Sequence, residues 1–374
     1  MKMFKKILVT GGAGFIGSYC VDLLIHKGYS VRILDNLTKQ IHPDGKKPKY
    51  LNPKAEFIHG DVTKKADIVH ALSGVDAVFH FAAAVGVGQS MYQIKHYNHV
   101  NCTGTGILLE ALINASKKIK KLVVAASMSS YGEGLYKCAR CAIVQPPLRS
   151  ENQLKKGIYD VFCPNCTKIL TPVATTENAR QNSNSVYAIT KKNQEEMVLV
   201  VGKAYDIPSV ALRYFNVYGP RQSLSNPYNG VAAIFMSRIK NNKSAIINED
   251  GLQTRDFIHI RDVTRANIMA LEKNSTDYES LNVGSGQPIT IRDVAIKLAK
   301  LYKSTIQPKI TYRIRKLDVR HCYADTQKIK KKLGWSASIS FEDGMKEVID
   351  WAKDEQAVDH VDFAMKELDR RGLR

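Results

Sequence analysis

The feature that most constrains this chain is a glycine-rich segment, residues 11–17, set between an apolar run and an amphipathic stretch. The run at 5–10 predicts a buried strand, and the stretch that follows the glycines predicts a helix. Backbone N–H groups and the helix dipole at such a turn bind a pyrophosphate. Gly11 would allow the tight turn, Gly14 the close approach of a phosphate and Gly17 the packing of helix on strand. The segment predicts a dinucleotide site.

A second predicted strand, residues 30–34, ends in Asp35. In a dinucleotide fold a carboxylate at this place accepts hydrogen bonds from the adenosine ribose hydroxyls and repels a 2′-phosphate, which favours NAD over NADP. Asp61 follows the next strand and could hold the adenine amino group, with an ordinary loop aspartate as the alternative. The cofactor contacts predicted at the glycine turn and after the strands are Gly11, Gly14, Phe15, Ile16, Gly17, Asp35, Asn36, Asp61, Val62, Phe81, Ala82 and Ala83.

Short apolar runs alternate with helical patterns along the first half of the chain. Because such alternation is typical of parallel strands joined by right-handed crossovers, we predict an α/β fold with a Rossmann-type, doubly wound parallel sheet. The predicted NAD-binding domain covers residues 1–210. A smaller α/β substrate-binding domain covers 211–374, and we assign the strand and turn at 282–286 to it.

The formal net charge of +20 predicts a positive potential that attracts anionic substrates. Nucleic-acid binding is not expected, because no basic groove with interleaved aromatic residues is evident. No apolar run approaches the roughly 20 residues of a membrane span, and the first apolar run is too short for a secretory signal. The expectation is a soluble cytoplasmic protein with no membrane or nucleic-acid partner.

A second candidate site is the pair Tyr187 and Lys191. On a helix, residues four apart lie on one face. An ammonium group beside a phenol favours the phenolate, which would lower the tyrosine pKa from its usual value of about 10 and create a base usable near neutral pH. A surface helix on which the two residues happen to have this spacing is the alternative.

A third candidate site is a pair of C-x-x-C motifs within residues 133–176. Four thiolates at such spacing suit a closed, tetrahedral, structural zinc site, formed by Cys138, Cys141, Cys163 and Cys166. Disulfides are not expected in a cytoplasmic protein, and a catalytic zinc would need an open ligand position. Because the insert has little apolar content and cannot bury a core, we expect a bound metal to stabilise its fold. We expect it to lie over or near the substrate pocket.

These motifs together resemble the extended short-chain dehydrogenase/reductase family, and within it the branch of NAD-dependent nucleotide-sugar epimerases and dehydratases. The resemblance rests on residues 10–17, 61–62 and 80–83 with Asn101, Ser127, Tyr187 and Lys191, and it covers nearly the whole chain outside the insert. It implies that Ser127 binds the reacting sugar oxygen, that Tyr187 takes the proton and that Lys191 bonds the nicotinamide ribose. Asn101, Tyr187 and Lys191 are thereby implied to contact the cofactor.

The resemblance also implies substrate contacts and narrows the reaction. Dehydratases of the branch carry an Asp-Glu pair after the serine position, where this chain has Met128 and Ser129, and 3,5-epimerases carry a cysteine there. Leu317 stands where the family usually has a glycine. Arginine forks suit a diphosphate, and the implied substrate ligands are Ser127, Ser129, Asn216, Arg255, Arg315 and Cys322, the last as a small residue at the sugar pocket.

We therefore expect a nucleotide-sugar 4-epimerase with tightly bound NAD, which abstracts a hydride from sugar C4 and returns it. The cysteine insert and residues 131–134, 225–228 and 320–322 resemble most the dTDP-L-rhamnose 4-epimerases, which make the 6-deoxy-L-talose sugar. UDP-glucose/galactose or UDP-uronate 4-epimerisation is the alternative substrate assignment. A net reductase would favour NADPH, against Asp35, and a non-catalytic NAD-sensing regulator is the alternative of another class. By analogy with the family we expect a homodimer.

Overall fold

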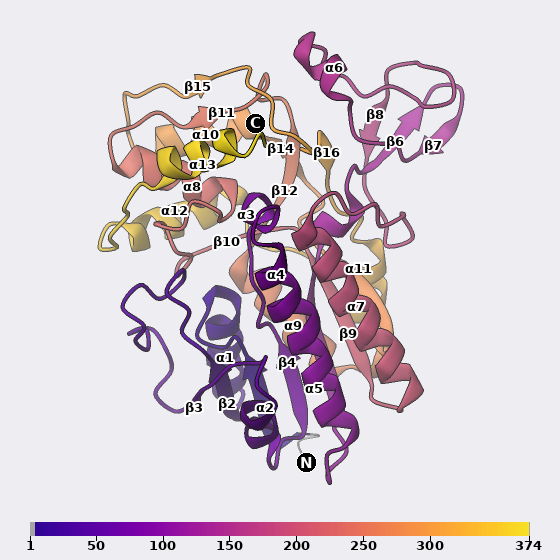
Figure 1. Ribbon diagram of the computed structural model, residues 1–374, viewed down its shortest axis with the longest axis vertical. Coiled ribbons are helices and arrows are strands. Elements are labelled where there is room, and N and C mark those ends of the chain that lie inside the picture. Colours follow the sequence, from indigo (N-terminus) through magenta and orange to yellow (C-terminus); the bar gives the residue numbers. More distant parts are fainter. Residues whose placement is uncertain (1–3, 374) are drawn as a thin grey trace.

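The structure is a computed structural model that describes residues 4–373. A seven-stranded parallel sheet forms the lower part of the molecule in Figure 1. Its strand order is β13-β9-β5-β4-β1-β2-β3. The strands are β1 (Lys6–Thr10), β2 (Ser30–Asp35), β3 (Glu56–His59), β4 (Ala77–His80), β5 (Lys121–Ser127), β9 (Ser209–Tyr214) and β13 (Glu279–Val283). Because the chain leaves β1 toward β3 and then continues from β4 on the other side, the strand order reverses between β1 and β4. The predicted doubly wound fold is confirmed.

Helices cover both faces of this sheet, so its strands are apolar on both sides. In β1, Ile7 and Val9 enter the core cluster that contains α1 (Phe15–His26) and α9 (Ile260–Glu272). Leu8 enters the opposite cluster. That cluster is covered by α2 (Lys65–Leu72), α5 (Gly104–Ile113) and α7 (Val186–Ala204). The pattern explains why β1 reads as a continuous apolar run.

The C-terminal region, at the upper left of Figure 1, has its own core and smaller sheets. One sheet contains β10 (Asn216–Tyr218), β12 (Thr254–His259), β14 (Pro288–Thr290) and β16 (His321–Cys322), and the other contains β11 (Ile246–Ile247) and β15 (Lys309–Ile310). The helices here are α8 (Val231–Lys240), α10 (Ile291–Leu301), α12 (Phe341–Ala352) and α13 (Val361–Arg370). Another helix, α11 (Gln327–Leu333), contacts the edge of the large sheet.

The assignment of the strand and turn at 282–286 to the smaller domain is wrong in part, because Asn282 and Val283 belong to the large sheet, whereas Ser285 and Gly286 donate to Asp256 of β12. Residues 279–283 form β13, which pairs in parallel with β9 at the edge of the large sheet. Leu281 and Val283 are buried in the same core as α9. The chain therefore crosses between the two regions more than once, and the division at residue 210 stays a prediction. Among the helices of residues 4–373, none is long and apolar enough to span a membrane.

The cysteine insert projects at the upper right of Figure 1. It contains a three-stranded antiparallel sheet of β6 (Leu135–Cys138), β7 (Ala142–Val144) and β8 (Thr171–Val173). The short helix α6 (Glu151–Lys155) lies in the segment that connects β7 to β8. Its buried apolar cluster is small: Tyr136, Cys138, Val161, Cys163 and Leu170. So few buried groups leave room for a metal to add stability.

Candidate active site

A cavity of about 700 Å³ lies at the carboxyl ends of β1, β4 and β5, between the large sheet and the C-terminal region. This is the place where a doubly wound sheet binds its ligand. The structure brings most of the predicted residues together in its wall: Gly11, Gly14, Phe15, Ile16, Gly17, Asp35, Asn36, Val62, Phe81, Ala82, Ala83, Ser127, Ser129, Tyr187, Lys191, Asn216, Arg255 and Arg315. It places Asp61, Asn101 and Cys322 outside that wall.

The glycine turn has no room for side chains. Gly11 has φ of +70°, and a Cβ on it would lie 2.8 Å from the backbone nitrogen of Ala82. A Cβ on Gly17 would collide with the carbonyl oxygen of Gly11. At the end of β2, the Asp35 carboxylate is buried and accepts hydrogen bonds from the N–H groups of Ala13 and Leu37, at 3.0 and 2.9 Å. A bare backbone turn at a helix start, beside a fixed carboxylate, fits a dinucleotide.

Two side chains that were predicted to contact the cofactor, Asp61 and Asn101, form hydrogen bonds with other groups of the protein. The Asp61 carboxylate accepts hydrogen bonds from the side chain of Asn36 at 2.9 Å and from Thr63. Asn101 is fully buried and bonds both backbone groups of Ala84, at 2.7 and 3.1 Å, and Thr190 of α7 at 2.9 Å. It therefore fixes the loop after β4 to α7, while its direct contact with a cofactor stays a prediction.

The three predicted catalytic side chains converge from two elements. Ser185 caps α7 by accepting a hydrogen bond from the N–H of Ala188 at 3.1 Å, which places Tyr187 in the first helical turn and Lys191 one turn later. Ser127 ends β5, and its hydroxyl lies 2.8 Å from that of Ser129. Ser127, Ser129 and Tyr187 all line the cavity, and the Ser127 side chain acts on the Tyr187 phenol by lowering its pKa.

The expected effect of Lys191 on the pKa of Tyr187 is not found. Burial raises the pKa of Tyr187 above its usual value, with the hydrogen bond from Ser127 opposing the rise. Burial lowers the pKa of Lys191 to about 7. The Lys191 amine donates to Oε1 of Gln194 at 2.6 Å. Desolvation outweighs the attraction that the spacing suggested, because both groups are buried together.

Gln194 belongs to a buried polar network that the sequence did not predict. Its amide nitrogen donates to the Thr105 hydroxyl at 2.8 Å, and the same hydroxyl lies 2.9 Å from Nε2 of His80. His80 Nδ1 bonds Thr10 at 2.8 Å, and burial lowers the pKa of His80 to about 3. This neutral network ties Lys191 to the ends of β1 and β4. Its sequence signal is weak: Gln194 lies three residues after Lys191 on one helix face.

The side chains that were predicted to bind the substrate differ in the hydrogen bonds and contacts they make within the protein. Arg255 donates to the Thr254 carbonyl at 2.8 Å and to the Asp318 carboxylate at 3.1 Å. In residues 4–373, the Arg315 side chain has no hydrogen bond or ion pair to another side chain or backbone group. Asn216 donates to the Asp256 carbonyl at 3.1 Å. Cys322 is buried in a small cluster with Tyr131, Phe215 and Ala324.

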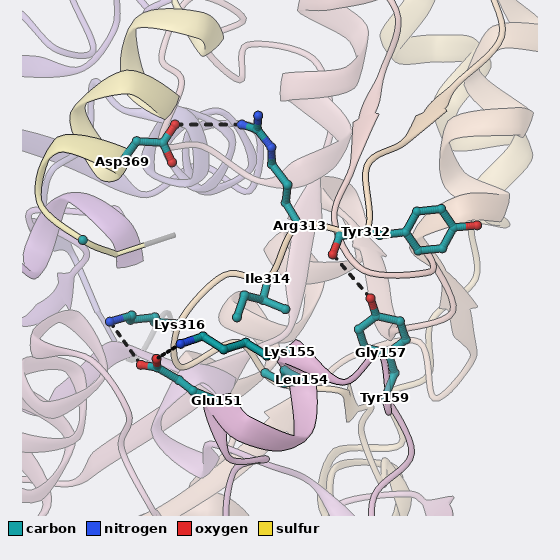
Figure 2. A pocket seen from close by; sticks show the side chains of 11 residues that line it. Glu151, Leu154, Lys155, Gly157, Tyr159, Tyr312, Arg313, Ile314, Lys316 and Asp369 are labelled. Atoms are coloured by element: carbon teal, nitrogen blue, oxygen red, sulfur yellow. Dashed lines mark hydrogen bonds and ion pairs between the residues drawn. The ribbon is translucent and has the colours of Figure 1, made fainter.

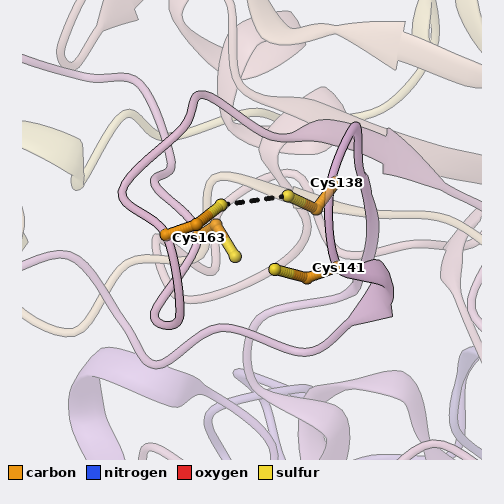
Figure 3. A group of neighbouring side chains, drawn as sticks. Cys138, Cys141 and Cys163 are labelled. Atoms are coloured by element: carbon orange, nitrogen blue, oxygen red, sulfur yellow. Dashed lines mark hydrogen bonds between the residues drawn. The ribbon is translucent and has the colours of Figure 1, made fainter.

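The four insert cysteines meet at one point (Figure 3). Their sulfur atoms all lie within 4.8 Å of one another, and those of Cys138 and Cys166 are 3.4 Å apart. A tetrahedral zinc with Zn–S bonds of about 2.3 Å needs sulfur atoms about 3.8 Å apart. The backbone N–H of Arg140 donates to the Cys138 sulfur at 3.4 Å and is the largest of several contacts that lower the pKa of that thiol to about 6, whereas the contact with Cys166 and burial raise the pKa of Cys141 to about 12. The donor set therefore fits zinc.

Two family models match the chain. The NAD dependent epimerase/dehydratase family matches residues 7–153, and GDP-mannose 4,6 dehydratase matches residues 170–348. Among curated proteins, the chain is 35% identical to a dTDP-L-rhamnose 4-epimerase of Burkholderia thailandensis, over 94% of this chain and 96% of the relative. It is 34% identical to a putative UDP-glucose 4-epimerase of Methanocaldococcus jannaschii, over 93% and 98%.

Solved structures are similar over the same extent. The UDP-glucose 4-epimerase of Thermotoga maritima with UDP-glucose has a TM-score of 0.77 at 31% identity, covering 93% of this chain and 98% of that one. The UDP-glucuronic acid 4-epimerase of Bacillus cereus with UDP-glucuronic acid and NAD has a TM-score of 0.73 at 29% identity, covering 93% and 99%. The chain belongs to the NAD-dependent epimerase/dehydratase family of extended short-chain dehydrogenases/reductases.

Proposed function

We propose that this protein is an NAD-dependent nucleotide-sugar 4-epimerase that interconverts dTDP-L-rhamnose and dTDP-6-deoxy-L-talose. The observation that carries the proposal is the meeting of Ser127, Tyr187 and Lys191 in one cavity, with the glycine turn at one end and Arg255 and Arg315 at the other. Such a cavity holds a dinucleotide and a diphosphate sugar at the same time. The names of the relatives support epimerisation at C4.

Each side chain has a distinct role in this proposal. When bound, NAD supplies the hydride acceptor that also returns the hydride, so no net oxidation occurs. Tyr187 takes the proton of the C4 hydroxyl and later gives it back, while Ser127 holds the same oxygen. Lys191 turns from Gln194 toward the ligands and contributes positive charge beside the phenol. Because burial raises the pKa of Tyr187 in the protein alone, that added charge is needed for proton transfer.

The diphosphate must stay fixed while the sugar presents its other face. Arg255 and Arg315 are suited to this task because a guanidinium binds phosphate oxygens through two parallel hydrogen bonds. Arg315 has no competing partner in the described part of the chain, and Arg255 is already oriented by Asp318. Dehydration is not favoured, since Met128 and Ser129 follow Ser127 and neither is a carboxylic acid for the elimination.

The choice of sugar is the finer part of the proposal. The dTDP-L-rhamnose 4-epimerase relative supports it through identity along nearly the whole chain. A UDP-hexose is the alternative, supported by the putative UDP-glucose 4-epimerase and by the structure with UDP-glucose. A UDP-uronate is supported by the structure with UDP-glucuronic acid.

We propose further that the cysteine insert holds one structural zinc per chain. The mutual distances of the four sulfur atoms support this, as does the absence of an open ligand position. Metal analysis of the purified protein should find about one equivalent of zinc. Protein with all four thiols free and no metal would contradict the proposal. Dimerisation stays a prediction by family analogy.

The proposed activity is tested by proton NMR on the purified protein with dTDP-L-rhamnose and no added cofactor. We expect new anomeric and H4 signals of the talo epimer at a constant total sugar concentration. Formation of a 4-keto-6-deoxy product would indicate net oxidation instead. If dTDP-L-rhamnose is unchanged while UDP-glucose or UDP-glucuronic acid is epimerised, the substrate assignment is wrong and the reaction type stands.

A further inference from the structure

The end of the cavity that contains Arg255 and Arg315 is called the sugar end, and the end that contains the glycine turn is called the NAD end. A buried ion pair joins the cysteine insert to the sugar end. Arg149, after β7 of the insert, donates to both carboxylate oxygens of Glu249, at 2.7 and 3.0 Å. Both side chains are only 2% exposed. Arg149 also reaches the carbonyl oxygen of Asp318 at 3.5 Å. A two-pronged, buried pair fixes geometry more firmly than a surface contact.

Glu249 holds a backbone conformation that glycine would take without cost. Its φ is +51°, in the left-handed region, which a residue with a Cβ keeps only where its surroundings enforce it. Its neighbour Asn248 and nearby Gln253 line the cavity, and the two are joined by a 3.2 Å hydrogen bond. The side-chain oxygens of Asn248 and Gln253 are buried without a partner. Arg149 thus enforces the shape of a loop whose residues Asn248 and Gln253 line the cavity.

A second connection runs from the base of the insert to Arg255. The Glu133 carboxylate accepts hydrogen bonds from the N–H groups of Arg320 and His321, at 2.9 and 2.8 Å. The Arg320 carbonyl in turn accepts one from Arg255 at 3.1 Å, and the Arg320 guanidinium contacts Glu249 at 3.1 Å. The insert therefore holds both the loop at 246–253 and the segment that orients Arg255.

The rim of this junction forms the groove in Figure 2. The Tyr159 hydroxyl of the insert donates to the Tyr312 carbonyl at 3.3 Å, and Glu151 pairs with Lys316 at 3.1 Å. Tyr312 and Leu317, which flank this stretch, also have positive φ, of 54° and 60°. Because the rim pairs are exposed, they contribute less than the Arg149 pair.

We propose that the insert is a clamp for the nucleotide-sugar end of the cavity, with Arg149 as its positioning residue, and that metal bound by the four cysteines sets nucleotide affinity by keeping the clamp folded. The inference rests on the proposed function. Within residues 4–373, no hydrogen bond or ion pair joins the insert to the glycine turn or to Asp35. Loss of the clamp therefore weakens nucleotide binding and leaves NAD in place.

The test compares Arg149→Met with Lys156→Met in the NAD-containing protein. Lys156 is an exposed residue of the same insert, so its replacement removes the same charge outside the junction. Calorimetric titration with dTDP and with UDP measures nucleotide affinity, and released NAD and bound zinc are quantified for each variant. We expect Arg149→Met to raise the dissociation constant of the preferred nucleotide at least tenfold, with NAD content unchanged. Lys156→Met should match the wild type.

Two further samples separate positioning from simple unfolding. In Arg149→Met/Glu249→Gly the glycine adopts the positive φ unaided, so nucleotide affinity should recover in part. Wild-type protein stripped of zinc by a chelator should show the same loss of nucleotide affinity as Arg149→Met while retaining NAD.

Nucleotide affinity unchanged in Arg149→Met or in the zinc-free protein would overturn the clamp. Loss of NAD together with nucleotide would also overturn it, because the insert would then support the whole fold. If the wild type binds neither dTDP nor UDP, the proposed function fails and the clamp fails with it. The two failures are thus distinguishable by the wild-type titration.

Discussion

The two ends of the cavity are formed by different kinds of chemical groups. The NAD end consists of backbone: a glycine turn, strand ends and a helix start, supported on both sides by the apolar cores of the large sheet. The sugar end consists of charged side chains paired across long stretches of sequence, such as Arg149 with Glu249 and Arg255 with Asp318. The first is therefore sensitive to an added methyl group, and the second to a lost charge.

The difference also appears in the residues that adopt positive φ. At the NAD end these include Gly11 and Leu37, and the N–H of Leu37 donates to the carboxylate of Asp35, two residues earlier. At the sugar end Glu249 adopts positive φ and is paired with Arg149, 100 positions away in the sequence. Such residues persist where other contacts enforce them, which is common near ligand sites. The sugar end is thus the part of the site that depends on contacts made elsewhere, above all in the insert.

The largest effect is expected at the point where the two ends meet. Tyr187→Phe removes the only phenol that we assign to proton transfer, so epimerisation should fall by about 10³-fold or more. Bound NAD and nucleotide affinity should stay near wild type, because neither end of the cavity is altered. The measurement is turnover by NMR at saturating sugar nucleotide. Turnover within threefold of wild type would remove Tyr187 from the mechanism.

The next largest effect tests the backbone character of the NAD end. A Cβ in Gly17→Ala would collide with the Gly11 carbonyl and lie 2.7 Å from Cα of Gly12. We expect bound NAD to fall roughly tenfold or more, since a shift of the turn removes its close approach to phosphate. Gly106→Ala is the matched control, because a Cβ there meets nothing within 4 Å. Equal NAD content in both variants would contradict the assignment of the turn.

A smaller effect tests the buried amine between the two ends. Burial lowers the pKa of Lys191 from 10.5 to about 7, so between these values the unfolded chain binds one more proton than the folded chain. Wild-type stability should therefore rise with pH over this range. Lys191→Met should be more stable than wild type in NAD-free protein by on the order of 2 kcal/mol below pH 7, with a gain that shrinks toward pH 10.

The measurement is urea unfolding of both NAD-free proteins from pH 6 to pH 10. Lys192→Met provides the control, because it removes the same charge from the next, half-buried position. A stability difference between wild type and Lys191→Met that does not change with pH would show that the amine is not shifted by burial.

The smallest effect is expected at the rim of the insert groove. Arg313 and Asp369 approach to 4.0 Å and are 65% and 46% exposed, so the solvent screens their attraction. Arg313→Ala should change the free energy of unfolding by less than about 0.5 kcal/mol. It should leave nucleotide affinity unchanged, in contrast to Arg149→Met. A tenfold change in nucleotide affinity would mean that the exposed rim, too, positions the ligand.

The NAD end was predictable because its signals are local. Strand, glycine turn, helix and the acid at the end of β2 follow one another within 35 residues, and the alternating pattern continues from them. The assignment of Asn282 and Val283 was wrong because a short apolar strand does not show which sheet it joins. Sheet membership is decided by tertiary packing, here on α9.

The sugar end was predictable only in part. The cysteine motifs located the insert and its four sulfur atoms. The Arg149–Glu249 pair joins residues 100 positions apart, and no sequence pattern signals it. The pKa of Tyr187 was predicted in the wrong direction, because residue spacing carries no information on burial. The contact between Gln194 and the Lys191 amine was not predicted for the same reason, because the sequence does not show that the two side chains are buried together.

The most direct test of internal hydride return uses dTDP-L-rhamnose with deuterium at C4, incubated with the purified protein without added cofactor. The talo product should keep its deuterium at C4, since the hydride that leaves one face returns to the other without meeting solvent. The readouts are proton NMR and the mass of the product. A product that has exchanged its C4 deuterium for solvent hydrogen would contradict epimerisation by hydride return.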